Sequence, residues 1–452
     1  MKKKLNLLWI TTIIVLMLGC TQTTTQMEAV ENDQVFANLE TFSLLELQED
    51  YDDLVSKYEL ESPKLFTDIV EMESIIISQR EKLVDSMNEI EFLRVLAPVV
   101  ASINCAHSSI NLSSTTYETI HDSGKFFALD VKIINDEIVV IDNSFETTVS
   151  VGSIIESING ILSSEIITRL KNSIPSDGQN ETTKYSRINE DFRTSFYLYI
   201  DASDSHILEY KESDSDLIKI IKIDALTIQE IYQENRYGNW VPYEAEYGDA
   251  YAILDMNSFQ PFDEYSITLY NSFIDNFFLT VESEGIQNII LDVRDNGGGD
   301  PMITSHLFNY LAKEEQAYFS QDVPNYYSGL KNIIPFLEPH FEGNLFVIMN
   351  GESGSSSGHL LALLKYQEVG VFIGEESGAS YVVSDSTIGH ALNNTKLNFR
   401  LSQQIWDVVV SGLTVGRGIM PDYEYNLSLS DYLSDEDDLL LYTISLIDDF
   451  TD

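Results

Sequence analysis

Cysteine is almost absent from this chain. Only Cys20 and Cys105 occur in 452 residues, which excludes a disulfide framework. The sequence also lacks a His-Glu-x-x-His motif and any paired Cys and His spacing, the patterns typical of zinc sites. We therefore expect no metal and no cofactor, and we interpret Cys105 as a small buried apolar residue that no ligand cluster accompanies.

Basic residues are scarce as well. The chain has 26 Lys and Arg against 73 Asp and Glu, which gives a formal net charge of −47 at pH 7. A protein that binds nucleic acid neutralises phosphates with clustered basic residues, whereas this surface would repel a polyanion. We therefore exclude nucleic acid as an expected partner. The acidity suits cationic peptide substrates, and solubility explains it equally well.

One long apolar run stands at the N-terminus. Three lysines precede an uncharged stretch from Leu5 to Leu18, and Gly19 and Cys20 follow it. The run is short for a membrane span, and its order of basic, apolar and small residues before a cysteine indicates a bacterial lipoprotein signal. We expect removal of 1–19, lipidation of Cys20 and an extracytoplasmic protein anchored to the bacterial cell membrane. A simply cleaved or an uncleaved anchor stays open, because Met17 stands where leucine is commoner.

The rest of the chain divides into several regions, since roughly 430 residues exceed one ordinary core. A polar stretch over 20–36 suits a flexible tether. Apolar residues recur at helical spacing over 37–120, which predicts a helical region. Alternating residues and an Asn-Gly turn predict a β-rich region over 121–215. Strands alternate with helices over 216–452, which predicts an α/β layer structure with buried, mainly parallel strands.

Two turns of small residues stand out in this last region. The apolar strands 289–293 and 345–349 run into the turns 296–301 and 353–358, and an amphipathic helix follows each turn. Glycines in the first turn let the backbone approach a substrate closely. A serine that begins a helix in the second turn lies near free amides and the positive end of the helix dipole. This arrangement suits acyl transfer.

Three serines of the second turn, Ser355, Ser356 and Ser357, are candidates for a nucleophile that a histidine activates. The alternative is that all three only cap a helix start, a position that serine favours. Residues 354–358 also match Gly-x-Ser-x-Gly, the nucleophile elbow of α/β-hydrolases, with Ser356 at the centre. That interpretation makes the protein an esterase with the downstream His390 as the base.

Five segments share patterns with one family. The first is an apolar strand that continues into Asp-x-Arg-x-Asn-x-Gly-Gly, at 288–299, and the second is a nucleophile segment at 350–365. Two glycine-containing motifs follow at 372–378 and 416–422, and the edge of a strand with Ile-Asn-Gly lies earlier, at 151–160. In these segments the chain resembles the carboxyl-terminal processing, or tail-specific, serine peptidases and their tricorn-core relatives. The resemblance implies an α/β fold with a crotonase-like catalytic domain over 216–452, a PDZ-like region over 121–215 and an N-terminal helical region over 37–120.

The resemblance also implies the nucleophile and the base. The register of the nucleophile segment selects Ser355. One branch of the family uses a lysine about 25 residues after the serine, but the matching residues 378–381 contain none. The other branch uses a histidine ahead of the PDZ-like region, and 101–109 is similar to that segment. His107 is therefore the expected general base, a role that suits a neutral imidazole.

Backbone amides complete the implied site. The amide of Ser356, with that of Gly297 or Gly298, is expected to form the oxyanion hole. Ala106 and Val415 stand where the histidine-dependent branch has a serine and a glutamate that complete a tetrad. The group that orients the histidine is left open, and the candidates are Glu375, Asp385 and Ser108.

These features predict a serine endopeptidase that hydrolyses peptide bonds of extracytoplasmic proteins or peptides through a Ser355 acyl-enzyme. Its expected partners are a protein or peptide substrate and the membrane that holds the lipid anchor. Besides the esterase, a lipid-anchored peptide-binding protein that has lost activity stays open, because the tetrad members are missing. We interpret Asp292 and Arg294 as residues that fix a turn, and His359 as structural.

Overall fold

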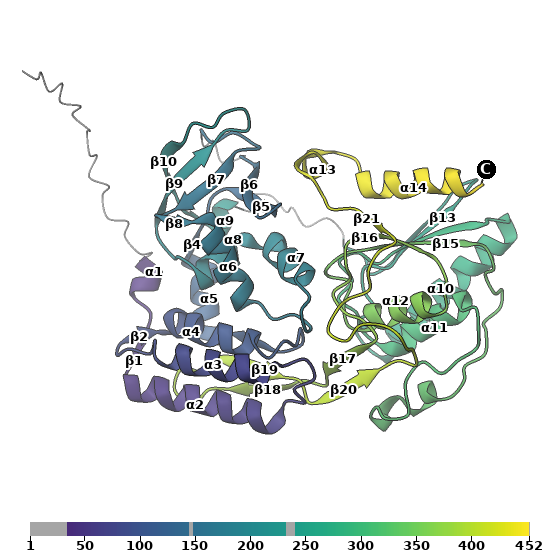
Figure 1. Cartoon of the computed structure of the whole chain (residues 1–452), viewed down its shortest axis with the longest axis horizontal. Helices are drawn as coiled ribbons and strands as arrows, with labels where there is room; N and C mark the ends of the chain where they lie inside the picture. Colours follow the sequence, from purple (N-terminus) through teal and green to yellow (C-terminus); the bar gives the residue numbers. More distant parts are fainter. Residues whose placement is uncertain (1–33, 144–147, 232–239, 452) are drawn as a thin grey trace, which may run out of the picture.

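The computed structural model of the chain describes residues 34–143, 148–231 and 240–451. Figure 1 shows two units stacked on one side of the molecule and a larger sheet with its helices on the other. The expected signal over 1–19, the lipidation site Cys20 and most of the expected tether over 20–36 lie outside the described residues. Within those ranges, no helix is both long enough and apolar enough to cross a bilayer.

The first unit is built mainly from helices, as the spacing of its apolar residues predicts. Asn88 begins helix α4 with a reciprocal capping box, and most of the helix is buried. Helices α2, α3 and α5 contribute buried residues to the same core. The elements of this unit are α1 (Gln34–Ala37), β1 (Thr41–Phe42), α2 (Leu44–Glu61), α3 (Ile69–Arg80), β2 (Met87–Asn88), α4 (Glu89–Ala101), β3 (Ser109–Asn111) and α5 (Ser114–Ser123).

A hairpin from the C-terminal half completes this first unit. Strands β18 (Ile388–Ala391) and β19 (Asn398–Leu401) pair with each other, and β19 also pairs with β3. Leu397 and Phe399 are fully buried in the same core as α4. The expected catalytic region over 216–452 therefore supplies part of the core of the first unit.

The second unit is an antiparallel sheet with three helices packed on it. The strand order is β10-β9-β7-β6-β5, with β8 paired to β7. Asn159 and Gly160 both have positive φ between β7 and β8, which confirms the predicted Asn-Gly turn. The elements are β5 (Asp130–Ile134), β6 (Glu137–Asp142), β7 (Ile154–Ile158), β8 (Ile161–Leu162), α6 (Ser163–Ser173), α7 (Thr182–Glu190), α8 (Phe192–Tyr199), β9 (Ser205–Lys211) and β10 (Lys219–Asp224). Strand β10 places the end of this sheet beyond the expected boundary at 215.

The third unit is a three-layer α/β structure. Its sheet has the order β12-β13-β14-β15-β16-β21, and every pair except β12 with β13 is parallel, as the sequence predicts. The elements are β12 (Glu244–Tyr247), β13 (Ala252–Asp255), α10 (Glu264–Glu284), β14 (Asn288–Asp292), α11 (Pro301–Leu311), β15 (Asn344–Met349), α12 (Ser356–Tyr366), β16 (Val371–Gly374), β21 (Tyr423–Glu424) and α14 (Asp438–Thr451).

Helices cover both faces of this sheet (Figure 1). Leu291 and Val347 pack with α10, α11 and α12, whereas their strand neighbours Ile290 and Phe346 pack with α14. Because successive side chains of a strand point to opposite faces, a strand between two helical layers must be apolar throughout. The helices on both faces of the sheet thus explain why the sequence is apolar without interruption along β14 and β15. A short antiparallel pair, β17 (Val382–Asp385) with β20 (Gln404–Asp407), lies between the third and first units.

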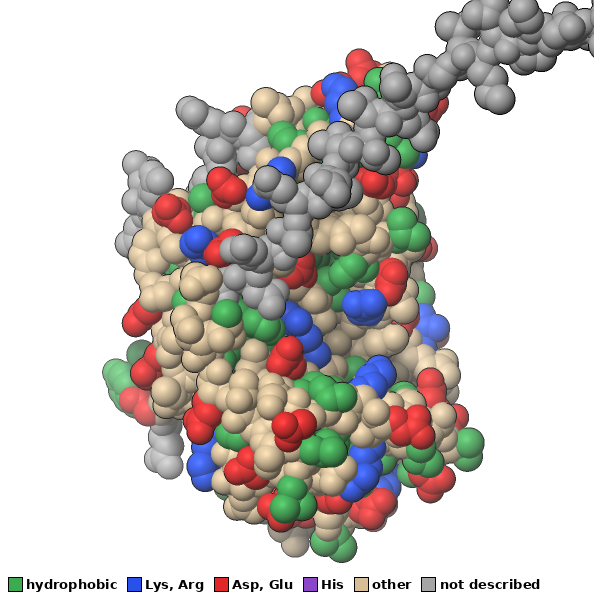
Figure 2. All heavy atoms as spheres, turned by 90° about the vertical axis from the view of Figure 1, so that its left-hand side faces the viewer, with side chains coloured by type: hydrophobic (Ala, Val, Ile, Leu, Met, Phe, Trp, Pro, Cys, Tyr) green, Lys and Arg blue, Asp and Glu red, His purple; other side chains and the backbone are tan. Residues whose placement is uncertain are grey.

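Side chains of different kinds mix on the face of the first and second units. Figure 2 shows acidic, basic and apolar side chains interspersed there, without one large acidic patch. The large negative charge of the chain is therefore spread out on this face. This distribution favours solubility over recognition of a cationic partner at this surface.

Candidate active site

Ser355 lies at a strained turn immediately before helix α12. It is the N-cap residue of this helix, with φ 49° and ψ −122°, and a positive φ is uncommon for any residue other than glycine. Such strain persists only where the surrounding structure enforces it, and it is frequent at functional sites. The turn thus presents the Ser355 hydroxyl at the end of parallel strand β15.

The first glycine turn packs against this serine. Strands β14 and β15 are paired neighbours, so the turns at their carboxyl ends meet, and the Gly354 amide donates to the Asn296 carbonyl at 3.0 Å. A Cβ atom on Gly298 would lie 2.7 Å from the Ser355 Cβ and 2.8 Å from the Ser356 nitrogen. Only glycine fits so close an approach, and Gly298 also has φ +96°.

His107 meets Ser355 across 248 residues of sequence. Its Nε2 lies 3.1 Å from the Ser355 Oγ, within hydrogen-bond distance. Helix α4 ends at Ala101, and His107 stands in the turn that follows it. The two residues that the resemblance selected are therefore together, although they come from the first and third units.

The expected oxyanion donors also line this place, with one difference. Among the described residues, the amide N–H groups of Ser356 and Gly297 have no hydrogen-bond partner. The amide of Gly298 instead donates to the Asn296 Oδ1 at 2.9 Å. Ser356 and Gly297 therefore have the amides that are free to bind a substrate oxygen, while Gly298 forms the wall beside them.

The alternative pair of Ser356 and His390 is not brought together. The Ser356 side chain is buried, and its hydroxyl has no hydrogen-bond partner among the described residues. His390 lies in the first unit, where its Nε2 is 2.9 Å from Glu61 and its ring stacks on Phe399. This geometry offers Ser356 no histidine base at position 390.

None of the three expected orienting groups contacts Nδ1, the ring nitrogen of His107 that faces away from Ser355. Asp385 lies 3.8 Å from Nε2, the nitrogen that faces Ser355. The Ser108 hydroxyl is buried without a hydrogen-bond partner in the described chain, and no contact joins Glu375 to the histidine. The buried Nδ1 of His107 is itself without a hydrogen-bond partner there.

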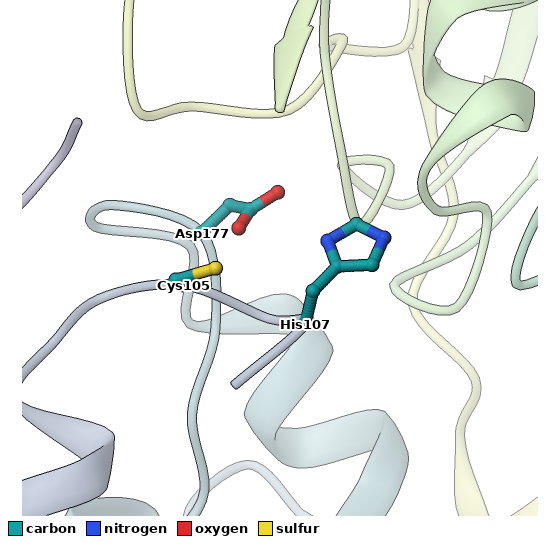
Figure 3. Close-up of side chains that lie close together, drawn as sticks. All are labelled: Cys105, His107 and Asp177. Carbon is teal, nitrogen blue, oxygen red and sulfur yellow. The ribbon is translucent and has the colours of Figure 1, made fainter. Parts of the chain in front are cut away.

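Asp177 from the second unit is the carboxylate that the sequence interpretation missed. Its side chain is 4% exposed, its Oδ1 accepts the Ala106 amide at 2.8 Å, and its Oδ2 has no hydrogen-bond partner within the described residues. Figure 3 shows it on the side of the His107 ring that faces away from the neighbouring helices of the third unit. The only sequence signal was a Ser-Asp-Gly turn, because its partner lies about seventy residues away.

Opposing effects act on the titration of these two groups. Burial lowers the pKa of His107, but the neighbouring Cys105 and the carboxylates of Asp385 and Asp177 outweigh it and raise this pKa to about 9. Burial raises the pKa of Asp177, and the positive charge of His107 opposes that shift. The surroundings therefore stabilise an imidazolium at position 107.

Cys105 contradicts the expectation that no ligand cluster accompanies it. Cys105, His107 and Asp177 each offer one ligand atom, and these three atoms lie within 4.8 Å of one another (Figure 3). Sulfur, imidazole nitrogen and carboxylate oxygen form a donor set that suits zinc. The sequence did not show the cluster because Asp177 joins it only through the fold.

A pocket with several aromatic residues in its walls opens beside Ser355. It has a volume of about 480 Å³, and its walls include Phe319, Tyr327 and Trp406. The Phe319 and Trp406 rings lie 5.4 Å apart between centroids, and those of Tyr327 and Trp406 lie 5.7 Å apart. His359 adds a buried ring whose pKa is lowered to about 3, by burial and by the charge of His107.

Arg294 ties the glycine turn to the C-terminal helix. Its guanidinium donates to Asp292 at 3.0 Å and to Asp437 at 3.1 Å. Asp437 immediately precedes α14, which covers the other face of the sheet. These contacts agree with a role of Asp292 and Arg294 in fixing the turn.

Comparison with known proteins identifies the third unit. Residues 250–425 match Peptidase family S41. This part of the chain is similar to that family. This match includes Ser355 and both glycine-containing turns, whereas His107 and Asp177 precede it. The third unit thus resembles a serine peptidase domain.

Solved structures share the fold over most of the chain. Mature CPAF is 13% identical, with a TM-score of 0.62, and the match covers 89% of this chain and 97% of that one. Mature CPAF complexed with lactacystin is 12% identical, with a TM-score of 0.60, covering 89% and 98%. A CPAF mutant is 10% identical, with a TM-score of 0.63, covering 89% and 97%. No curated protein sequence matches the chain.

Proposed function

We propose that this S41-family protein is a serine endopeptidase with Ser355 as nucleophile and His107 as general base. The observation that carries the proposal is the 3.1 Å approach of the His107 Nε2 to the Ser355 Oγ, at a strained turn beside unpaired amides. In the neutral imidazole, whose fraction grows as the pH approaches the raised pKa of about 9, Nε2 accepts the serine proton while Oγ attacks a peptide carbonyl. An acyl-enzyme forms, and water hydrolyses it.

The oxyanion of the tetrahedral intermediate is held by backbone amides. The free N–H groups of Ser356 and Gly297 are the donors in this proposal, since the Gly298 amide is already bonded to Asn296. Each such donor stabilises the transition state by about 3 kcal/mol. The dipole of α12 adds to the effect, because Ser356 is the first residue of that helix.

Asp177 takes the place of the missing orienting group. A carboxylate near Nδ1 keeps the proton of a neutral histidine on that nitrogen, so that Nε2 is free to accept. It also stabilises the imidazolium that forms during attack. The two unpaired buried atoms, the His107 Nδ1 and the Asp177 Oδ2, support this role.

The substrate is a protein or peptide outside the cytoplasm. The pocket beside Ser355 suits a large side chain, because Phe319 and Trp406 offer apolar area, while Asp385 and Gln404 add polar groups to its lining. The lipoprotein signal places the enzyme at the outer side of the bacterial cell membrane. Mass spectrometry of the N-terminal peptide measures the lipid on Cys20.

Fluorophosphonate labelling tests the proposed site. Purified wild type, Ser355→Ala, Ser356→Ala and His107→Ala are treated with the probe, and mass spectrometry locates the label. We expect a label on Ser355 that requires His107, together with cleavage of internal bonds in unstructured peptides. A label on Ser356 would instead indicate the esterase. No label on any variant, with peptide still bound, would indicate the inactive binding protein.

A further inference from the structure

The described residues hold one mixed cluster of metal-binding side chains, and it lies behind the proposed base. Cys105 and His107 come from the turn after α4, and Asp177 comes from the turn between α6 and α7. Figure 3 shows the three side chains converging, with one ring nitrogen of His107 on the side of Cys105 and Asp177. The other nitrogen, Nε2, faces Ser355.

Two atoms of this cluster have unused capacity to bind a ligand. The Nδ1 of His107 and the Oδ2 of Asp177 are both buried and without hydrogen-bond partners among the described residues. Asp177 is 4% exposed, so water cannot easily satisfy its oxygen. An unpaired buried polar atom is costly, and each one calls for a partner such as water or an ion.

Neighbouring groups hold the three donors in place. The Ala106 amide donates to the Asp177 Oδ1 at 2.8 Å, which leaves Oδ2 for a ligand. The Cys105 Sγ lies 3.3 Å from the Ser402 Oγ and 3.3 Å from the Ser384 carbonyl. Outer hydrogen bonds of this kind orient ligands in metal sites, and the Ser402 hydroxyl is able to donate to a thiolate.

The donors and their spacing favour zinc. Zinc binds sulfur at about 2.3 Å and nitrogen or oxygen at about 2.0 to 2.2 Å, so its tetrahedral ligand atoms lie roughly 3.3 to 3.7 Å apart. The three ligand atoms here lie within 4.8 Å of one another, and small side-chain shifts close the difference. Calcium and magnesium require oxygen ligands, which this cluster does not supply in number.

We propose that Cys105, His107 and Asp177 form a zinc site, with Zn²⁺ bound by the Sγ, Nδ1 and Oδ2 atoms and a water as fourth ligand. Binding converts the thiol to a thiolate and releases its proton to solvent. A neutral imidazole that binds zinc through Nδ1 carries its proton on Nε2. That nitrogen then donates to the Ser355 Oγ and is unable to accept its proton.

Bound zinc therefore inhibits the peptidase reversibly. The inhibition rests on the proposed function, whereas metal binding does not depend on it. Zinc also binds the Asp177 oxygen that orients the histidine. One ion therefore blocks both the general base and the carboxylate that orients it. The site thus gives the enzyme a reversible control by divalent transition metals.

Cobalt binding to the full chain tests the site without using activity. Metal-free protein is titrated with Co²⁺, and the near-ultraviolet band of a Co–thiolate bond and the visible bands of tetrahedral Co²⁺ are measured. We expect both sets of bands in wild type and their loss when Zn²⁺ is added. Cys105→Ser removes the thiolate band. Asp177→Asn weakens zinc binding at least ~10-fold, because even residues that only hydrogen-bond to metal ligands reduce metal affinity by this much when they are mutated.

Ser355→Ala is the matched control, because it removes the nucleophile and leaves the three ligands. It is expected to keep the cobalt spectrum, so a failure of the peptidase proposal does not affect this readout. In the peptidase assay, Zn²⁺ inhibits wild type, a chelator restores activity, and Cys105→Ser or Cys105→Ala loses sensitivity. Absence of a thiolate band in wild type, or equal zinc inhibition of the Cys105 variants, overturns the proposal.

Discussion

At the scale of single residues, the environment of His107 decides how this site works. The ring is surrounded by Cys105, Asp177 and Asp385, which together raise its pKa against the effect of burial. Only one of these groups, Asp177, has a free oxygen on the side away from Ser355. In the proposed mechanism, the positive charge that forms on the histidine during attack is therefore stabilised by a carboxylate that a different unit supplies.

Asp177→Asn is expected to lower kcat by about 10³- to 10⁴-fold with little change in KM, because an amide favours the wrong tautomer of a histidine base. Steady-state kinetics on a peptide that wild type cleaves measures both constants. Asp385→Asn is the control, since Asp385 lies on the Nε2 side at 3.8 Å and is expected to cost far less. Equal losses in both variants would argue against a special role for Asp177.

Glu352 makes stability depend on pH. Burial raises the pKa of this carboxyl to about 7, an effect that Arg187 at 3.5 Å opposes and that Glu190 and Asp295 reinforce. A raised pKa means that the folded state binds the proton more tightly, so stability falls as pH rises from about 4.5 to about 7. Glu352→Gln is expected to raise Tm at pH 8 by a few degrees and to leave Tm at pH 4.5 nearly unchanged. Thermal unfolding at both pH values measures this difference.

At the scale of elements, the site depends on two parallel strands that end side by side. Strands β14 and β15 are paired, so the glycine turn after one touches the serine turn after the other. The positive φ of Ser355 and the absence of a side chain at Gly298 are two parts of one contact. Helix α12 then begins directly at the free amide of Ser356. This arrangement links backbone geometry to the stabilisation of an oxyanion.

Gly298→Ala is expected to lower kcat by at least ~100-fold, because the added methyl would meet Ser355 and Ser356 and displace an oxyanion donor. Gly297→Ala is the matched control, since a Cβ atom there meets nothing within 4 Å. Fluorophosphonate labelling rates and peptide kinetics of both variants are compared. A loss in Gly297→Ala as large as in Gly298→Ala would contradict the close-contact explanation.

At the scale of the whole molecule, the three units are joined where the site forms. The hairpin of β18 and β19 completes the core of the first unit, and the Asp177 turn bridges the second unit to the histidine turn. The Gly178 amide donates to Asn104 at 3.0 Å, and the Gln179 amide donates to Gly416 at 2.8 Å. We infer that the first and third units unfold together, since the hairpin from the C-terminal half holds part of the core of the first unit.

Phe399→Ala is expected to destabilise the protein by about 3 to 5 kcal/mol, the usual cost of truncating a buried phenylalanine. Phe399 is fully buried among residues of α2 and α4, so the loss lowers the stability of both units in one transition. Chemical denaturation, followed by fluorescence and by peptidase activity, measures it. Leu60→Ala is a control, because Leu60 on α2 is 82% exposed. Activity that survives the unfolding of the first unit would show that the units are independent.

The sequence alone determined the α/β layer, its parallel strands and the two turns, because apolar periodicity and glycine or serine positions act over a few neighbouring residues. The family resemblance added Ser355 and His107, whose proximity the structure then showed. Only the tertiary structure placed Asp177 beside the histidine, paired Cys105 with both, and moved the hairpin 388–401 into the first unit. These contacts join residues about seventy to about three hundred positions apart in the sequence. Patterns among neighbouring residues do not predict them, because the packing of the cores brings these residues together.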